Sequence, residues 1–510
     1  MACKVRIRYV VALAAFFAIF LNHCIKNVTN VTLVAMTGAG VLPENFTNIL
    51  MSTPANGNKS EEELSNFNSS NIIVTPTIAT HEVIIWDHIT RNFVQGSFFY
   101  GYIILQLPSG RISEFIGSRM ILGPAVMLGC VLSFLFPFTA QFGVYPAAAL
   151  RFTQGLLIGV TFPCVLNLFS RWTPISERSW LLSLIYSGSG IGLVVIEVVS
   201  GYLSASNFLG GWPSLYYLIG IAGIVWFVFW TLLVRNNPET HPLTTAEEVA
   251  EINKGRNKAL SRTVRKIWTQ VLLFKIATSI PFYALITTAL ASSWTNYVVA
   301  TQQPEYLTGV LGFEIQDNGV LSALPHVGST ISSILFAIVC DKLRKTQRFS
   351  VTFLRKFFNS IVSSALQLSK ELWYQVREKV VKNLEEGILI EKLLSIYLGS
   401  SVNHVEMSPT FAGTLMGIAN CISNIPGFLV PMVTSKIVGE SKDYAIWGKL
   451  FYLTAVIDAL GGLIFCLLGS SELQSWDPEF NVDIPKKPKN KTKDKTSPEE
   501  NNNNKQALDV

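Results

Sequence analysis

Long stretches without any charged residue constrain this chain more than any other feature of its sequence. No Asp, Glu, Lys or Arg occurs in residues 120–150, 198–234 or 407–435. A helix needs about 20 mostly apolar residues to cross the ~30 Å hydrocarbon core of a membrane. Only 15% of the residues are charged, against about a quarter in soluble proteins. The pattern predicts an all-α polytopic membrane protein and argues against a soluble enzyme.

The charged residues lie in short clusters between the apolar stretches. The net charge is +6, but the basic residues do not gather into the patch that a nucleic-acid partner requires. Alternate connections carry Lys and Arg instead, which is typical of cytoplasmic loops. The sequence therefore predicts no nucleic-acid partner and places both termini in the cytoplasm. The basic connections lie at residues 4–8, 111–119, 171–178 and 235–266.

The apolar stretches predict two membrane halves. They are residues 1–235 and 269–471, joined by a cytoplasmic central loop at 236–268 and followed by a disordered cytoplasmic tail at 472–510. The tail is rich in Lys, Pro and Asn, a composition that cannot build a core. The first half has spans at 9–36, 92–110, 120–140, 145–170, 180–203 and 213–234. The clear spans of the second half lie near 271–300, 318–340, 411–437 and 447–469.

The loop between the first two spans, residues 43–85, is polar and holds three N-glycosylation sequons, at Asn45, Asn58 and Asn68. Glycosylation requires a lumenal or extracellular face, so these sequons agree with a cytoplasmic N-terminus. The seven cysteines mostly lie in apolar stretches and have no metal-ligand spacing. They are expected to be free thiols, and no metal site is predicted.

The layout of six spans, a basic loop and six spans is similar to that of the major facilitator superfamily, whose halves enclose a mid-membrane site. GRISEFIGSR at 110–119 resembles the superfamily's loop between spans two and three, and CDKLR at 340–344 resembles its counterpart after span eight. A narrower resemblance is to solute carrier family 17, the anion–cation symporters. It rests on GSFFYGY at 96–102, RFTQGL at 151–156, WTPISERS at 172–179, LSALP at 321–325 and VNH at 402–404.

This resemblance implies about 12 spans in two six-helix halves that work by alternating access. It implies a secondary active transporter of inorganic phosphate or small organic anions. The coupling ion would be Na⁺ or H⁺, and no other cofactor is expected. The partners would be a small anionic substrate, the coupling ion and the lipid bilayer. The location would be the plasma membrane or a lysosomal or vesicular membrane. No enzyme activity is implied.

Residues 363–395 depart from the family pattern, which has apolar spans nine and ten in this region. They include KELWYQVREKVVKNLEEGILIE at 370–391, whose charges are typical of an amphipathic helix on a membrane surface. One hypothesis is an alternative exon or a gene-model error. The other is a membrane protein that keeps the carrier fold but acts as a binding or scaffold partner without transport.

A cation buried in a span is costly, so it marks a binding site or has a partner there. Arg151 opens a long uncharged stretch, and its guanidinium suits a carboxylate or phosphate. The alternative is an interface arginine that reaches outward. Lys26 occupies the position where the resemblance implies a substrate-contacting arginine in span one. It could bind substrate or anchor the span at the interface.

Two positions depart from the proton-coupled and vesicular members of the family. Ile158 stands where those members have a glutamate two turns after the span-four arginine. Ser293 precedes Trp294 of span seven, where the vesicular glutamate type has an arginine. Both changes argue against a glutamate carrier of that type. The remaining acids within spans, Glu197 and Asp458, are candidates for coupling to Na⁺ or H⁺ or for structural roles.

Weaker candidates complete the predicted site. Tyr100, Tyr102, Asn296 and Tyr297 could donate hydrogen bonds to substrate, although such residues often only pack. A histidine can titrate near neutral pH, but His326 is expected to be structural. The predicted cytoplasmic gate consists of Glu114, Arg119, Glu177 and Arg178.

Overall fold

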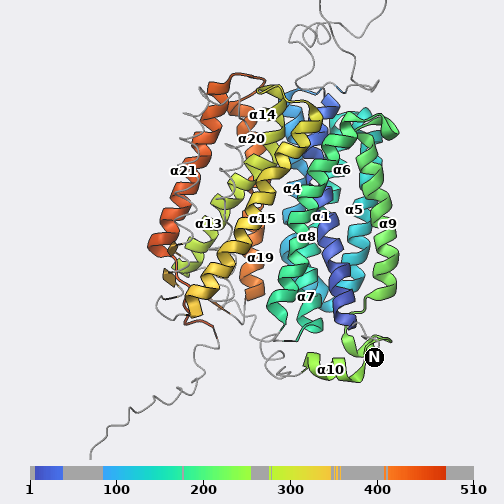
Figure 1. Cartoon of the computed structure of the whole chain (residues 1–510), viewed down its shortest axis with the longest axis vertical. Helices are drawn as coiled ribbons and strands as arrows, with labels where there is room; N and C mark the ends of the chain where they lie inside the picture. Colours follow the sequence, from blue (N-terminus) through green and yellow to red (C-terminus); the bar gives the residue numbers. More distant parts are fainter. Residues whose placement is uncertain are drawn as a thin grey trace, which may run out of the picture.

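Long helices make up the described parts of the molecule, as the charge-free stretches predict. The computed structural model describes residues 6–37, 84, 86–174, 177–253, 275–276, 278–345, 350, 352–353, 356–357, 407–408 and 412–477. The helices run side by side in two groups, blue to green for the first half and yellow to red for the second (Figure 1). The predicted all-α fold is confirmed.

The first half contains helices at all six predicted spans. Five of those spans are single helices and the fourth is divided, so the predicted positions hold to within a few residues. The helices are α1 (Ile7–Thr37), α4 (His88–Ile116), α5 (Ser118–Gln141), α6 (Val144–Ile158), α7 (Thr161–Trp172), α8 (Arg178–Ala205) and α9 (Pro213–Leu233), with the short turn η2 (Phe208–Gly210) before α9.

The fourth span is broken at Gly159 and Val160, which corrects the expectation of one continuous helix over 145–170. Pro163 explains the break because proline has no N–H for the carbonyl four residues earlier and its ring clashes with that carbonyl. Asn22 of α1 donates from Nδ2 to the carbonyl oxygen of Ile158 at 3.2 Å. This hydrogen bond ties the broken span to α1.

Helices α4 and α6 pack backbone against backbone. A Cβ on Gly101 would lie 2.0 Å from the carbonyl oxygen of Phe152, and a Cβ on Gly155 would lie 1.9 Å from that of Phe98. Only glycine fits at these two positions, because any side chain would force the helices apart. The close packing holds Arg151, on α6, near the aromatic side chains of α4.

The second half is described in spans seven, eight, eleven and twelve. The helices are α13 (Ile280–Tyr297), the π-helical turn η4 (Val298–Gln302), α14 (Gln303–Gly309), α15 (Ile315–Lys345), α19 (Ala412–Ser423), α20 (Pro426–Ile437) and α21 (Tyr444–Leu468). The described helices α13 to α14 carry span seven to Gly309, about nine residues beyond its predicted end, while residues 271–274 at its predicted start lie outside the described residues. Span eleven is divided just before Pro426, again at a residue that cannot donate to the preceding turn.

Seven helical segments among the described residues are long and apolar enough to cross a membrane. They are Ile7–Thr37, Ser118–Gln141, Val144–Trp172, Trp180–Ala205, Pro213–Leu233, Gly417–Ile437 and Tyr444–Leu468. The polar loop with its sequons, the atypical segment at 363–395 and the tail beyond residue 477 lie outside the described residues.

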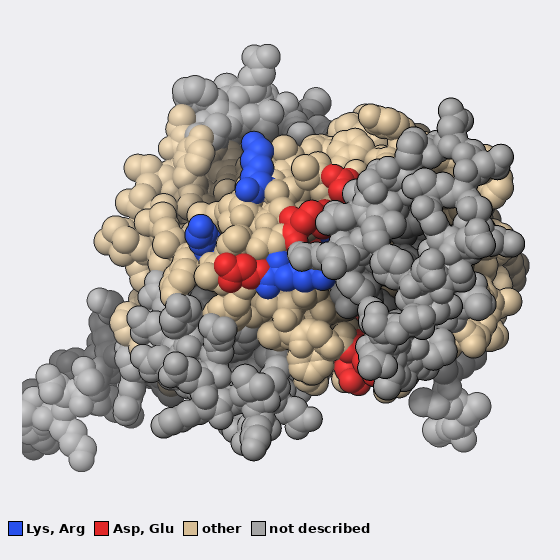
Figure 2. All heavy atoms as spheres, turned by 90° about the horizontal axis from the view of Figure 1, so that it is seen from above, with Lys and Arg blue, Asp and Glu red and all other residues tan. Residues whose placement is uncertain are grey.

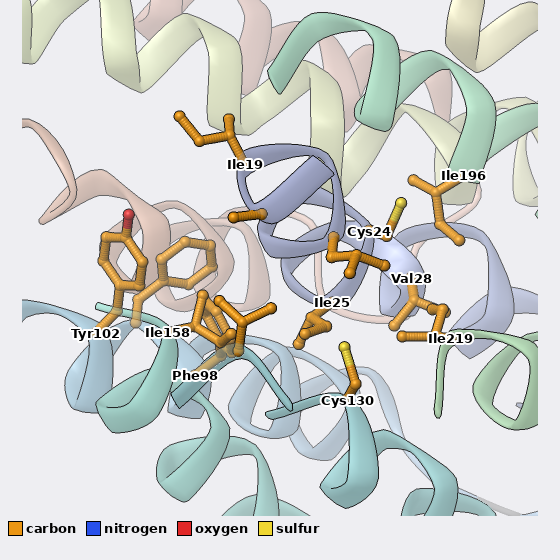
Figure 3. Close-up of a cluster of buried hydrophobic side chains, with 14 of the residues drawn as sticks. Ile19, Cys24, Ile25, Val28, Phe98, Tyr102, Cys130, Ile158, Ile196 and Ile219 are labelled. Atoms are coloured by element: carbon orange, nitrogen blue, oxygen red, sulfur yellow. The ribbon is translucent and has the colours of Figure 1, made fainter. Parts of the chain in front are cut away.

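The core of the first half surrounds α1. Its side chains Ile25 and Val28 point toward neighbouring helices, and Phe98 of α4, Cys130 of α5 and Ile219 of α9 complete the cluster (Figure 3). All five are buried. Because α1 is enclosed on several sides, its polar residues are held at fixed positions within the bundle.

The two halves meet along α8 and α15 and along α4 and α20. A Cβ on Gly201 of α8 would lie 2.8 Å from the Cα of Gly319 of α15. A Cβ on Gly319 would lie 2.7 Å from the carbonyl oxygen of Glu197. The backbones of α8 and α15 therefore touch close to the last residues of α8 and the first residues of α15. Helix α14, which precedes α15, lies at the upper end in Figure 1, opposite the N-terminus.

The chain after α9 returns to the start of α1. It forms the turn η3 (Pro238–Thr240) and then α10 (Ala246–Asn253), which lies beside the N-terminus at the lower end (Figure 1). Glu248 of α10 accepts hydrogen bonds from the backbone N–H groups of Ile7, at 3.2 Å, and Arg8, at 3.0 Å. These bonds satisfy two donors that every helix leaves free at its first turn.

Candidate functional site

Lys26 of α1 lies at the boundary between the two halves. Its Nζ donates to the hydroxyl of Tyr297 on α13 at 2.8 Å. It also lies 4.9–5.5 Å from the ring centres of Phe99, Tyr102 and Tyr297. Aromatic faces attract a cation. The structure thus brings together three of the predicted substrate-binding residues, Lys26, Tyr102 and Tyr297.

Arg151 lies behind Lys26, fully buried within the first half. Its guanidinium donates to the carbonyl oxygens of Ile25, at 2.8 Å, and Lys26, at 3.1 Å. It also donates to Gln154 Oε1 at 3.0 Å and Thr29 Oγ1 at 3.3 Å. Its charged carbon lies 4.7 Å from the ring centre of Phe98. The side chain therefore holds α1 and α6 together at the level of Lys26.

The surroundings of both cations are neutral. Among the described residues, no carboxylate forms an ion pair with Lys26 or Arg151. Every hydrogen-bond partner of the two side chains is a hydroxyl, an amide or a backbone carbonyl. Charges buried in proteins are normally paired. The core of the molecule thus carries positive charge for which its described residues supply no counter-ion.

Asn424 is a residue of the site that the sequence analysis did not identify. It lies between α19 and α20, and its Oδ1 accepts from Tyr297 Oη at 2.6 Å and from Lys26 Nζ at 3.5 Å. Its Nδ2 lies 3.5 Å from Gln106 Oε1 of α4. The available signal was an asparagine two positions before Pro426, within a span that has no charged residue between Met407 and Ser435.

Two of the predicted substrate-binding residues lie apart from this cluster. The hydroxyl of Tyr100 donates to Met432 Sδ at 3.4 Å, and its ring packs against Phe428 of α20. Asn296 donates to the carbonyl oxygen of Ser292 in its own helix at 3.1 Å. These contacts join α4 to α20 in the first case and stay within α13 in the second.

The coupling candidates lie on different helix interfaces. Glu197 of α8 is buried, and its Oε1 lies 3.6 Å from Nε2 of His326 on α15. Asp458 of α21 accepts a hydrogen bond from the hydroxyl of Thr295 on α13. Glu197 therefore faces the other half of the molecule, whereas Asp458 joins two helices of the second half. His326, which is expected to be structural, therefore contacts one of the predicted coupling residues.

The predicted gate residues are described only in part. The side chains of Glu114 and Arg178 lie outside the described part of the chain. Arg119 donates to the carbonyl oxygen of Thr231 on α9 at 2.7 Å. Glu177 forms an ion pair with Arg8 at 2.9 Å. The two described gate residues therefore bind partners within the first half.

The upper end carries a second charged cluster that joins the halves. Arg91 of α4 forms an ion pair with Glu305 of α14 at 2.7 Å, and His88 Nε2 lies 3.3 Å from the same carboxylate. The backbone N–H of His88 donates to Glu440, which follows α20. Seen from this end, acidic and basic side chains lie side by side across the middle of the face (Figure 2).

Other predictions concern metal and carbohydrate. The described residues contain no group of three or more His, Cys, Asp or Glu side chains suited to a metal ion. Cys24, Cys130, Cys164, Cys421 and Cys466 are free thiols. The sequons at Asn45, Asn58 and Asn68 lie outside the described residues.

Comparison with known proteins gives the relationships of this fold. Residues 15–357 match the family model of the Major Facilitator Superfamily. The chain is 32% identical to sialin of Ovis aries, over 92% of this chain and 90% of that protein. It is 32% identical to a Drosophila melanogaster protein named "Putative inorganic phosphate cotransporter", over 81% of this chain and 78% of that protein.

Further relatives extend this pattern. Human vesicular glutamate transporter 2 is 32% identical, over 77% of this chain and 67% of that protein. A bacterial homologue of the human lysosomal transporter Spinster, in an inward-facing and unoccupied conformation, has the same fold. Its TM-score is 0.61 at 14% identity, over 91% of this chain and 97% of that one.

The matched family and the relatives identify this two-half helical bundle as a membrane transporter, not an enzyme. The chain belongs to the major facilitator superfamily. Within the superfamily it belongs to solute carrier family 17, the anion–cation symporters, as its resemblance to that family implies.

Proposed function

We propose that this transporter carries inorganic phosphate or a small organic anion by alternating access, coupled to Na⁺ or H⁺. The observation that carries the proposal is the positive charge at its centre. Lys26 and Arg151 lie within the helical bundle, and no carboxylate of the described residues pairs with them. An anion supplies the missing negative charge, which is why intramembrane cations mark substrate pathways.

The position of Lys26 suits a carrier rather than a static anion site. Its ammonium belongs to α1 of the first half, while Tyr297 and Asn424 belong to the second half. An anion that replaces Tyr297 as a partner of Lys26 would alter the contact between the halves. Binding energy would then favour one arrangement of the halves over the other, as alternating access requires.

The upper end is the closed end in this proposal. Arg91 and Glu305 hold α4 against α14 there, and α8 touches α15 through Gly201 and Gly319. The substrate would be exchanged at the opposite end in this state. That end holds the N-terminus and α10 (Figure 1), and we assign it to the cytoplasm from the basic connections of the sequence.

We assign the coupling of anion transport to Na⁺ or H⁺ to two carboxylates within the bundle. Glu197 faces His326 across the boundary between the halves, and Asp458 contacts α13, the helix that carries Tyr297. A carboxylate can bind Na⁺ or take up a proton. With Ile158 and Ser293 at the positions that differ from the vesicular glutamate type, a phosphate or organic-anion carrier is favoured.

The names of two relatives bear on the substrate class and on the membrane. One D. melanogaster relative is named for inorganic phosphate cotransport, and a human relative is named for vesicular glutamate transport. We therefore propose a plasma, lysosomal or vesicular membrane location. The loop at 43–85 would be glycosylated on the lumenal or extracellular side.

Uptake of radiolabelled phosphate by cells that express the full chain tests the function. The assay is run with Na⁺ and with choline in its place, and then with an imposed proton gradient. Lys26→Met is compared with wild type at matched surface level. Lys442→Met is the control, because this lysine is exposed between α20 and α21. The proposal expects uptake that needs Lys26 and an ion gradient but not Lys442.

The outcomes separate the proposal from its alternative. No uptake of phosphate or of a panel of organic anions, despite surface delivery, would favour a carrier fold without transport. Uptake that is unchanged by Lys26→Met would show that the anion site lies elsewhere.

A further inference from the structure

The carboxamide of Asn424 is held in one orientation. Its Nδ2 donates to the carbonyl oxygen of Asn420 at 2.7 Å and lies 3.5 Å from Gln106 Oε1. Both of these oxygens can only accept a hydrogen bond. The amide nitrogen is therefore directed to acceptors outside the Lys26 cluster, and Oδ1 is the atom that Asn424 presents to Lys26.

A fixed acceptor therefore lies inside a site whose net charge is positive. Asn424 Oδ1 accepts from the Tyr297 hydroxyl at 2.6 Å, and this hydroxyl accepts from Lys26 Nζ at 2.8 Å. Lys26 attracts the oxygens of an anion. Asn424 Oδ1 repels an oxygen that carries no hydrogen, because both atoms would then be acceptors. Asn424 is also at most 9% exposed, so water does not readily replace a missing donor.

We propose that the site selects anions that carry their own O–H group, and this inference rests on the proposed function. The O–H of the anion donates to Asn424 Oδ1 and replaces the Tyr297 hydroxyl there. That hydroxyl is then free to donate to a charged oxygen of the same anion, while Lys26 neutralises it. Every donor and acceptor of the cluster is paired. Hydrogenphosphate ions and 2-hydroxy carboxylates meet this requirement.

Sulfate and simple carboxylates do not meet it at neutral pH, because they have no O–H to donate. If such an anion accepts the hydrogen bond that the Tyr297 hydroxyl donates, Asn424 Oδ1 loses that donor. If the Tyr297 hydroxyl continues to donate to Asn424 Oδ1, the anion has one hydrogen-bond donor fewer. Either case leaves a buried polar group without its partner, and the expected loss of affinity is at least about tenfold.

Anion protection of the purified full chain against thermal unfolding tests this selectivity directly. Two pairs are compared at pH 7.4: phosphate with sulfate, and lactate with propionate. Lactate and propionate have the same charge and differ by one hydroxyl. The concentration for half-maximal protection should be at least about tenfold lower for the O–H member of each pair.

Variants of the acceptor sharpen the test. Asn424→Leu removes the acceptor at similar size, so the ratio within each pair should fall to near one. Asn424→Thr places a hydroxyl there that both donates and accepts, so sulfate should gain relative to phosphate. Asn167→Leu is the control, because it removes an equal amide that contacts Ser113 on α4 instead. It should keep the wild-type ratio.

The ratio is measured within one protein, so a less stable variant does not obscure it. Equal protection by both members of each pair, abolished by Lys26→Met, would overturn the selectivity and leave the anion-carrier proposal standing. An unchanged ratio in Asn424→Leu would overturn the role of Asn424. Absence of protection by any of the four anions would overturn both proposals.

Discussion

Arg151 of α6 donates a hydrogen bond to the backbone carbonyl oxygen of Lys26 on α1, at 3.1 Å. Arg151 therefore binds the backbone of the same residue whose side chain reaches the second half. Arg151 donates its hydrogen bonds to α1 and to Gln154, whereas the Lys26 ammonium donates to Tyr297 in the other half. Their replacement should have different consequences.

Arg151→Ala should destabilise the protein strongly. It removes four hydrogen bonds and leaves a space between α1 and α6, at a cost of about 3 kcal/mol. Lys26→Met should lower the unfolding temperature little, since it removes an unpaired buried charge, but should abolish anion binding. Thermal unfolding in detergent measures both. A larger loss of stability in Lys26→Met would contradict this division of roles.

Tyr297→Phe should weaken substrate binding without unfolding the protein. It removes one hydroxyl that contacts Lys26 and Asn424, so the KM for uptake should rise about five- to tenfold. Tyr283→Phe on the same helix is the matched control, because Tyr283 is 55% exposed. An equal change of KM in both variants would indicate an effect of α13 as a whole.

Arg91→Ala should loosen the upper end. The ion pair of Arg91 with Glu305 joins α4 to α14 at 2.7 Å, and its loss should favour separation of the halves there. A cysteine in place of Ser435, which accepts from Asn92 at 2.9 Å, should react several-fold faster with a membrane-impermeant thiol reagent. The double variant Arg91→Glu/Glu305→Arg should restore slow labelling. Fast labelling in that variant would argue against the ion pair as the cause.

Gly155→Ala should disrupt the contact between α4 and α6. The added Cβ would lie 1.9 Å from the carbonyl oxygen of Phe98, and neither helix backbone can move without disturbing Arg151. We expect a loss of several kcal/mol, seen as low yield of folded protein in detergent. Gly448→Ala on α21 is the control, because nothing lies within 4 Å of its added Cβ. It should leave the yield unchanged or raise it.

The attachment of α10 to the N-terminus should depend on pH. A hydrogen bond from Arg8 lowers the pKa of the Glu251 carboxyl below its ordinary value of 4.5. A carboxyl whose pKa is lowered by folding contributes stability at neutral pH and loses it as pH falls through the lowered pKa. The protection factors of the α10 amides, which compare each exchange rate with the intrinsic rate at the same pH, should therefore stay high at pH 5. They should fall only below pH 4.5.

Glu251→Gln tests the cause of this dependence. The variant should already exchange faster at neutral pH and should lose the change on acidification, because the amide does not titrate. Glu247→Gln on the same helix is the control. The same pH dependence in wild type and Glu251→Gln would assign the effect to another group.

The helices of the bundle could be predicted because each needs only local information. Spans such as α5 and α9 are long, apolar and bounded by polar residues, so bilayer thickness alone fixes their existence. The breaks were less evident, since Pro163 and Pro426 lie within apolar stretches. A proline in a span is tolerated only if neighbouring groups bind the backbone carbonyls that it leaves free. Which groups do so cannot be predicted from the sequence.

The sequence by itself determined that this chain is a helical transporter of two halves, and it identified Lys26, Arg151 and Tyr297 as candidates. The tertiary structure decided how these residues relate. Tyr297 reaches Lys26 across 271 positions of the chain, and Asn424 joins them from a helix break that the sequence analysis passed over. A span is encoded by the local cost of burying polar groups in lipid. A site is encoded by contacts between distant spans, which exist only once the halves have packed.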